Sequence, residues 1–309
     1  MQRAENGAVT LAARDRGPLI AFAVTVLVGG LNFVAVRFSN RELPPFEGAA
    51  LRFAAASLLF LAYAGVRGIA LPRGRGLIGA VLFGLLGFSG AYAFLYWGLV
   101  SAPAGMGSVA LALVPVATPL LAAVHGLERL RARSLIGGAV AAAGIAVVLS
   151  GQLATTLPLA SVVALLLAAV AAAESGVVIK YFPRSHPAAT NGVAMGVGAA
   201  ALVLISRIAG ETWVVPAQPA TLIAYGYIVV STIVLFALIL YILGRWSASA
   251  ASLQFPIQPL VTVVAAGILA GEGIALPFVI GAVIVLVGVL VASGVQLRAA
   301  DRPLADQTS

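Results

Sequence analysis

Ten long apolar segments limit what this chain can fold into more than any other feature. Each has roughly the 18–25 residues that an α-helix needs to cross the hydrocarbon core of a bilayer. Of the 309 residues, 61% are hydrophobic and only 9% are charged, too few to cover the surface of a soluble domain. The sequence therefore predicts an all-α integral membrane protein. The ten expected transmembrane helices are 18–37, 45–66, 76–98, 103–125, 134–151, 158–181, 188–208, 219–243, 247–271 and 274–296.

The residue types that are missing exclude several classes of site. The chain has no cysteine, which excludes a disulfide framework, an iron–sulfur centre and a thiol nucleophile. Its two histidines, His125 and His186, are far apart in the sequence, which disfavours a zinc site. The sequence also lacks a nucleotide-binding loop and paired catalytic carboxylates. We therefore expect no metal, no cofactor and no enzymatic activity.

The basic residues predict how the chain is oriented. The net charge of +8 is spread over short loops rather than gathered on one face, which argues against a nucleic-acid partner. With the N-terminus in the cytoplasm, fourteen basic residues fall on the cytoplasmic side and four on the other side. This bias predicts that both polar tails, 1–17 and 297–309, are cytoplasmic. Arg52, just inside the second segment, is expected to snorkel to the outer headgroups.

The two halves of the chain repeat each other. A serine, a proline, a glutamate and two glycines recur at one spacing, although a chain with 34 glycines matches some of them by chance. Each half holds five segments, an odd number, so the second half must enter the membrane upside down. We therefore predict two inverted five-helix repeats, 18–151 and 158–296. The matched residues are Ser108, Pro115, Glu128, Gly137 and Gly144 in the first half and Ser252, Pro259, Glu272, Gly281 and Gly288 in the second.

Three stretches of the first half carry a family resemblance: GGLNFVAVRF, PPFEGAALRF and LYWGLVSAPAGMGSVALALVPVATPLLA. With the repeated proline and glutamate of the second half, the chain resembles the ten-helix, EamA-like members of the drug/metabolite transporter superfamily over residues 18–296. The resemblance implies a secondary transporter in a bacterial inner membrane, with alternating access around a central cavity. One departure is Gly29-Gly30, where the family often has a tryptophan before the glycine.

An ionisable residue lies within the sixth segment. Glu174 has no basic residue within a helical turn along the chain, so it must face a wet cavity, find a partner or stay protonated. We interpret it as a proton-coupling or substrate-binding carboxylate, and a protonated structural acid is the alternative. Its neighbour Ser175 aligns with Asn32 of the first segment. Both are candidates for substrate binding, with hydrogen bonding between helices as the alternative.

A polar stripe runs along the ninth segment. Gln254 and Gln258 are four residues apart, so they share one face of a helix. Pro256 and Pro259 remove backbone donors beside them and loosen the helix. The aligned positions of the first repeat are apolar, so the stripe is not part of the shared scaffold. We predict that both glutamines bind substrate, and hydrogen bonding between helices is again the alternative.

The third segment holds an aromatic cluster. Tyr96 and Trp97 are expected to anchor at the membrane interface, where aromatic side chains gather. Tyr92 lies one turn deeper and is the candidate for substrate binding. The two repeated glutamates are expected to cap neighbouring helix N-termini, and for Glu128 an ion pair with Arg129 or Arg131 is the alternative. Structural roles at helix ends are assigned to Glu128, Glu272, Pro115 and Pro259.

Together, the polar residues and the resemblance predict export of a small polar metabolite, with amino acids as the expected substrates. Uptake or uncoupled facilitated diffusion within the same superfamily stays open. A membrane-embedded lipid-modifying enzyme would need clustered Asp, His or Lys, and this chain has one lysine and two separated histidines. No residue excludes a sensor without flux. The expected partners are a small-molecule substrate and the lipid bilayer, and the oligomeric state is open, a monomer included.

Overall fold

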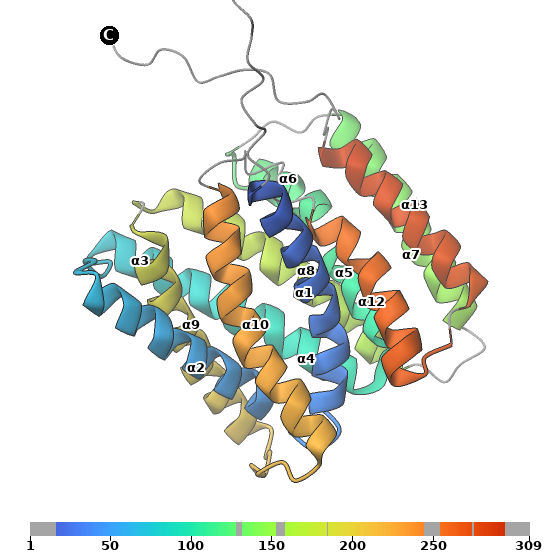
Figure 1. Cartoon of the computed structure of the whole chain (residues 1–309). Helices are drawn as coiled ribbons and strands as arrows, with labels where there is room; N and C mark the ends of the chain where they lie inside the picture. The colour runs from blue at the N-terminus through green and yellow to red at the C-terminus, as the bar shows by residue number, and fades with distance from the viewer. Residues whose placement is uncertain are drawn as a thin grey trace, which may run out of the picture.

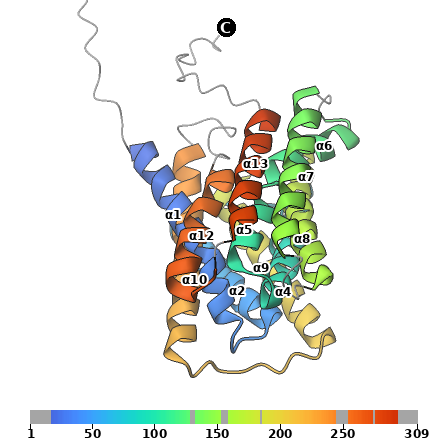
Figure 2. The same cartoon turned by 90° about the vertical axis from the view of Figure 1, so that its right-hand side faces the viewer.

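The protein folds into a bundle of helices (Figures 1 and 2). A computed structural model describes residues 17–127, 132–152, 158–183, 185–243, 254–273 and 275–293. These residues contain no β-strand. Seven of their helical segments are long and apolar enough to cross a membrane, and three further apolar helices are shorter. The prediction of an all-α membrane protein is therefore confirmed at the level of fold class.

The helices begin and end within a few residues of the predicted spans, except where the chain is not described. In the first half they are α1 (Gly17–Ser39), α2 (Pro45–Val66), α3 (Arg75–Phe83), the π-helix η1 (Gly84–Gly90), α4 (Ala91–Ser101), α5 (Ala104–Leu111), α6 (Val114–Val124) and α7 (Ala132–Gln152). In the second half they are α8 (Leu159–Val178), the 3₁₀ turn η2 (Ile179–Tyr181), α9 (Pro187–Ile208), α10 (Pro219–Leu243), α12 (Gln254–Ala270) and α13 (Leu276–Ser293). Residues 247–253, where the ninth span was predicted to begin, lie outside the described part.

The third predicted span contains a π-helical segment that periodicity did not predict. The segment η1 contains three glycines, Gly84, Gly87 and Gly90, which bring no side chain between η1 and its neighbours. A Cβ atom on Gly84 would collide with the backbone of Ala194 on α9, and one on Gly87 would lie 2.9 Å from the Ser175 hydroxyl on α8. The glycines therefore allow η1 to lie directly against two helices of the second half.

The fourth predicted span is broken between α5 and α6. Pro115 lies in the first turn of α6, where a proline is tolerated because the first turn needs no intrahelical N–H bond. A proline ring also clashes with the carbonyl group four residues earlier, here that of Leu111, where α5 ends. Its repeat partner Pro259 lies inside α12, which continues past it. The same residue type therefore breaks one helix and is accommodated in the other.

Helices of the first half pack mainly against helices of the second half. Helix α7 packs along α13, α2 along α9, and α5 against α12 (Figure 1). Other large contacts between the halves include those of α1 with α10 and of α4 with α8. In both of these pairs, the first span of one half meets the third span of the other. Corresponding helices of the two halves therefore make corresponding contacts.

The glycines of the repeat lie at the interface between α7 and α13. A Cβ atom on Gly144 would come within 2.8 Å of the Gly281 carbonyl oxygen, and one on Gly288 within 2.6 Å of the Gly137 carbonyl oxygen. The sequence repeat aligns Gly137 with Gly281 and Gly144 with Gly288, so the alignment exchanges these two contacts. Their coincidence in the sequence has a physical cause, because only glycine permits this approach of two backbones.

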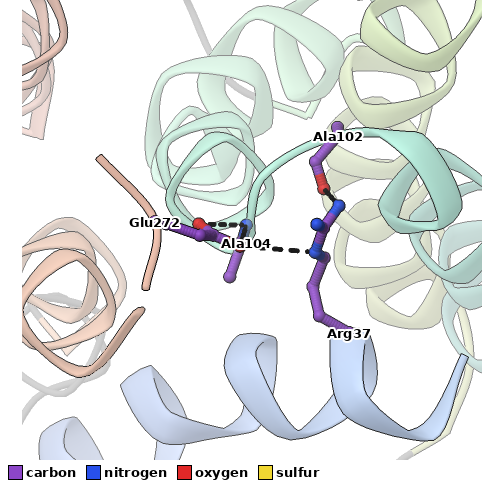
Figure 3. A network of polar contacts seen from close by, with 4 residues as sticks. All are labelled: Arg37, Ala102, Ala104 and Glu272. Atoms are coloured by element: carbon purple, nitrogen blue, oxygen red, sulfur yellow. Dashed lines mark hydrogen bonds and ion pairs between the residues drawn. The ribbon is translucent and has the colours of Figure 1, made fainter. Parts of the chain in front are cut away.

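Loops from the second half close the end of the bundle where α1 ends and α2 begins, which we call the Arg37 end. Arg37 donates to the carbonyl oxygen of Ala102, and its Nε lies 3.3 Å from Oε1 of Glu272 (Figure 3). Both Glu272 oxygens accept from the backbone N–H of Ala104, at 3.3 and 3.2 Å, where α5 begins. Carboxylates are favoured at helix N-termini, where backbone N–H groups lack partners. Glu128, the repeat partner of Glu272, lies outside the described residues.

Two further helices have carboxylates at their N-termini at the Arg37 end. Glu211, in the loop between α9 and α10, accepts from the backbone N–H groups of Phe46 and Glu47, both at 3.0 Å, where α2 begins. Glu42 in turn accepts from the backbone N–H groups just before α10, which belong to Ala217 and Gln218. The first and second halves therefore cap each other at this end.

We expect Glu272→Ala to destabilise the folded protein. The change removes the cap of α5 and the partner of Arg37, so we expect a loss of about 1 kcal/mol, or roughly 2–4 °C in the midpoint of thermal unfolding. Detergent-solubilised protein measured by intrinsic fluorescence would show it. Arg41→Gln is the control, because Arg41 is exposed at the same end and its guanidinium lies over the ring of Phe38 rather than at a helix N-terminus. Equal midpoints for Glu272→Ala and the control would contradict the capping role.

Candidate functional site

A buried arginine lies inside the bundle, on α2. Arg52 is only 3% exposed, so the expectation that it snorkels to the headgroups is wrong. Its Nε donates to the hydroxyl of Thr232 on α10 at 2.6 Å, and a terminal nitrogen donates to the hydroxyl of Tyr96 on α4 at 3.3 Å. These two hydroxyl groups hold the guanidinium inside the protein, since it would otherwise lose its hydration without replacement.

Aromatic rings surround this guanidinium. Its central carbon lies 5.1 Å from the ring centre of Tyr92 and 5.3 Å from that of Phe53, within the range of a cation–π interaction. Tyr92 packs edge-on against Phe53, with ring centres 4.6 Å apart. Tyr96 is fully buried, so its assignment to the membrane interface is wrong, whereas Trp97 is 42% exposed. The spacing of four residues places Tyr92 and Tyr96 on one face of α4, towards Arg52.

Arg52 lacks an acidic partner in the part of the chain that the structure describes. Among the residues that the structure describes, no carboxylate lies within ion-pair distance of its guanidinium. A buried charge without a counter-ion is costly, and structural arginines inside proteins are normally paired. The rings and the two hydroxyl groups compensate for part of this cost only, because they carry no negative charge.

Asn32 lies on α1 and is linked to the same helix, α10. Its amide Nδ2 donates to the Ser231 hydroxyl at 3.0 Å and to the Val28 carbonyl oxygen at 3.2 Å. Its Oδ1 is buried and has no hydrogen-bond partner. Ser231 directly precedes Thr232, which accepts a hydrogen bond from Arg52. Adjacent residues of α10 therefore bind the side chains of Asn32 and Arg52. Asn32 therefore serves as a link between helices through one amide atom and leaves the other free.

The two glutamines of the polar stripe are buried on α12. Gln254 is 4% exposed and Gln258 is 7% exposed, and neither amide group makes a hydrogen bond to the protein among the described residues. Gln258 lies against α1, where a Cβ atom on Gly29 would collide with its amide nitrogen. Buried amide groups without protein partners normally bind water or a ligand. Thr262, one turn further along, donates to the carbonyl oxygen of Gly30 at 2.9 Å and holds α12 against α1.

Glu174 has a partner that its sequence neighbourhood did not indicate. Its Oε1 lies 2.7 Å from Nε2 of His125, at the end of α6, and its Oε2 is buried without a partner. The Tyr181 hydroxyl donates to the His125 carbonyl oxygen at 2.7 Å, which fixes the backbone at this point. Ser175 points elsewhere, because its hydroxyl donates to the Ala172 carbonyl oxygen and lies against Gly87. No described contact joins Glu174 or Ser175 to the glutamines or to Asn32.

Two cavities lined by described residues contain no candidate residue. The larger is an open groove of about 450 Å³ between α6, α7 and α8, and its lining is almost wholly apolar. The smaller, about 10 Å³, lies among apolar side chains of α5, α7 and α8. An apolar groove at the surface of a membrane bundle fits lipid chains. The chemistry therefore lies with the buried polar groups and not with these spaces.

Comparison with known proteins identifies the family. The chain matches the EamA-like transporter family twice, over residues 16–150 and 159–294. An "Uncharacterized transporter" of Archaeoglobus fulgidus is 28% identical over 281 residues, which cover 88% of this chain and 97% of that protein. The "Uncharacterized inner membrane transporter YedA" of Escherichia coli is 27% identical over 258 residues, 81% of this chain and 82% of that protein. These names are those of transporters and not of enzymes.

A shorter match has a more specific name. The "Probable terminal-alkyne amino-acid exporter" of Streptantibioticus cattleyicolor is 35% identical over 128 residues, and the match spans 41% of this chain and 43% of that protein. A solved crystal structure shares the fold, with a TM-score of 0.64 at 21% identity over 91% of this chain and 97% of that one. The doubled family match covers nearly the whole chain outside its tails, so this protein belongs to the EamA-like transporter family and is a multi-pass membrane transporter of small molecules.

Proposed function

We propose that the protein exports small polar metabolites, amino acids above all, across a bacterial inner membrane by alternating access. One observation carries this proposal: several buried polar side chains inside the bundle are not fully satisfied by the described residues. Oδ1 of Asn32 has no hydrogen-bond partner. Gln254 and Gln258 are buried and make no hydrogen bond through their amides among the described residues, and the guanidinium of Arg52 has two hydroxyl partners but no carboxylate among them. Such groups require water or a ligand. The relatives named as an amino-acid exporter and as a "Probable amino-acid metabolite efflux pump" of Salmonella typhimurium support the substrate class and the direction.

We further propose ten transmembrane helices in two inverted repeats, 18–151 and 158–296, with both termini in the cytoplasm. The exchanged contacts between α1 and α10 and between α4 and α8 support the repeat, as do the reciprocal glycine contacts of α7 and α13. Transport then follows from rocking one half against the other around the central polar groups. The caps at the Arg37 end belong to the state in which that end is closed.

The topology predicts opposite locations for two positions that flank α7. Reporter proteins fused after Arg133 and after Gln152 should report the cytoplasm and the periplasm, respectively, because one membrane span separates them. Alkaline phosphatase and a fluorescent protein, which are active on opposite sides, would measure this. The same location for both fusions would break the proposed helix count.

The proposed substrate-binding residues are Asn32, Tyr92, Gln254 and Gln258, with Glu174 and Ser175 nearer the other end of the pathway. Cysteines can test the glutamines directly, because the native chain has none. We expect Gln254→Cys and Gln258→Cys to react with a water-soluble thiol reagent in native membranes, and excess substrate to slow both reactions. Leu260→Cys and Val264→Cys are matched controls on the same helix, since these side chains are 50% and 58% exposed on the outside of the bundle. Inert cysteines at both glutamines would contradict a wet cavity.

Glu174 remains the proposed site of proton coupling, now with His125 as its partner. A carboxylate and an imidazole 2.7 Å apart can share and release a proton, and both side chains are partly exposed. The pairing also supports a second candidate function, an uncoupled facilitator in which the pair only joins α6 to α8.

Flux in proteoliposomes distinguishes these candidates. We expect an imposed pH gradient to drive amino-acid flux through the wild type, and Glu174→Gln to abolish the response to the gradient while exchange at equal pH persists. His125→Gln should weaken the same response, because Glu174 loses its partner. Flux that ignores the gradient in the wild type would identify a facilitator. The absence of flux for every amino acid would overturn the proposed substrate class.

A further inference from the structure

We propose that Arg52 binds the carboxylate group of the transported molecule, with Tyr96 and Thr232 holding the guanidinium in place. The inference rests on the proposed function, because the carboxylate group that Arg52 binds belongs to the transported substrate. The sequence indicated no role for Arg52 beyond contact with headgroups, and its burial in the bundle removes that role.

The charge of Arg52 is the first argument. The side chain is 97% buried, yet no described carboxylate pairs with it. Arginine stays protonated in proteins, so the site keeps a positive charge at every physiological pH. A bundle that carries one uncompensated cation is stabilised by any anion that reaches it. An anionic substrate would supply the missing counter-ion.

The geometry of the guanidinium is the second argument. It has five N–H donors, and its hydrogen bonds to Thr232 and Tyr96 use two of them. The rings of Tyr92 and Phe53 lie close to the group and limit its rotation. The remaining donors are therefore held in a fixed orientation, and a fork of parallel N–H groups matches the two oxygens of a carboxylate.

The surroundings favour a carboxylate over a phosphate, and an α-amino acid over a simple acid. Arg52 is the one basic side chain of the described helices that lies about two turns from a helix end, roughly 10 Å at 1.5 Å per residue. A single positive charge balances a carboxylate but leaves a phosphate dianion in excess. Asn32 is tied through Nδ2 to Ser231, which lies beside Thr232, and its Oδ1 is a buried acceptor without a donor that suits a substrate ammonium group.

The test measures binding rather than flux, so that it does not depend on the direction of transport or on coupling. Purified protein is screened for thermal stabilisation by the twenty amino acids. The amino acid that stabilises most is then compared by calorimetry with its carboxamide and with its decarboxylated amine, which lack the negative charge. Acetate and inorganic phosphate are run as probes of the anion alone.

We expect the wild type to bind the amino acid at least about tenfold more tightly than its carboxamide, as charge-assisted bonds predict. Arg52→Gln should bring the two affinities within about twofold of each other. Thr232→Val and Tyr96→Phe keep the charge and should reduce the preference only in part. Arg41→Gln, which removes an exposed charge, should leave it unchanged.

The outcomes that contradict the anion site differ from those that contradict the proposed substrate class. If Arg52→Gln does not fold, Arg52→Lys and the two hydroxyl variants still decide, since an unchanged preference in all three overturns the proposal. A preference for the carboxylate that survives Arg52→Gln also overturns it while leaving amino-acid export intact. If no amino acid binds but acetate or phosphate stabilises the wild type and not Arg52→Gln, the anion site stands and the proposed substrate class falls. A wild type that responds to no anion overturns the proposal.

Discussion

The burial of Arg52 organises the polar interior of this bundle. A guanidinium can remain inside a membrane protein only if other helices replace its water, and here α10 and α4 supply hydroxyl groups while α2 and α4 supply ring faces. These partners come from both halves of the chain. Any rotation of one half against the other must therefore change the environment of this cation. A transporter gains from such an arrangement, because a ligand that completes the charge balance favours the conformation that holds it.

Close approach of backbones makes this arrangement possible. Lipid supplies no hydrophobic drive for helix association, so small residues and local hydrogen bonds decide which helices meet. Gly84 brings η1 against α9, and the reciprocal glycine contacts join α7 to α13. The Ser57 hydroxyl donates to the Gly192 carbonyl oxygen at 2.7 Å, and this hydrogen bond joins α2 to α9. The polar interior therefore depends on contacts between the two halves, in addition to the contacts of Arg52 with Tyr92 and Tyr96 inside the first half.

Most of the fold could be predicted because the bilayer imposes a length on each apolar segment. The expected bounds of α2 and α10, for example, agree with the structure. The interruptions could not be predicted in the same way. Pro115 breaks its helix and Pro259 does not, and the π-helical segment that begins at Gly84 lies directly against α9. Hydropathy and spacing describe one helix at a time, whereas these features depend on the neighbouring helix.

The site was even harder to predict from the sequence than the interruptions of the helices. Glu174 and His125 are 49 residues apart in the chain, and Arg52 and Thr232 are 180 apart, so no local pattern pairs them. The departure from the family at Gly29 is a further case. A side chain there would occupy the place of the Gln258 amide, so the glycine and the glutamine belong to one contact. Read singly, the glycine weakens the argument for a cavity and the glutamine strengthens it. Together they describe one contact between α1 and α12, in which the absence of a side chain at Gly29 leaves room for the Gln258 amide, and neither residue indicates this contact alone.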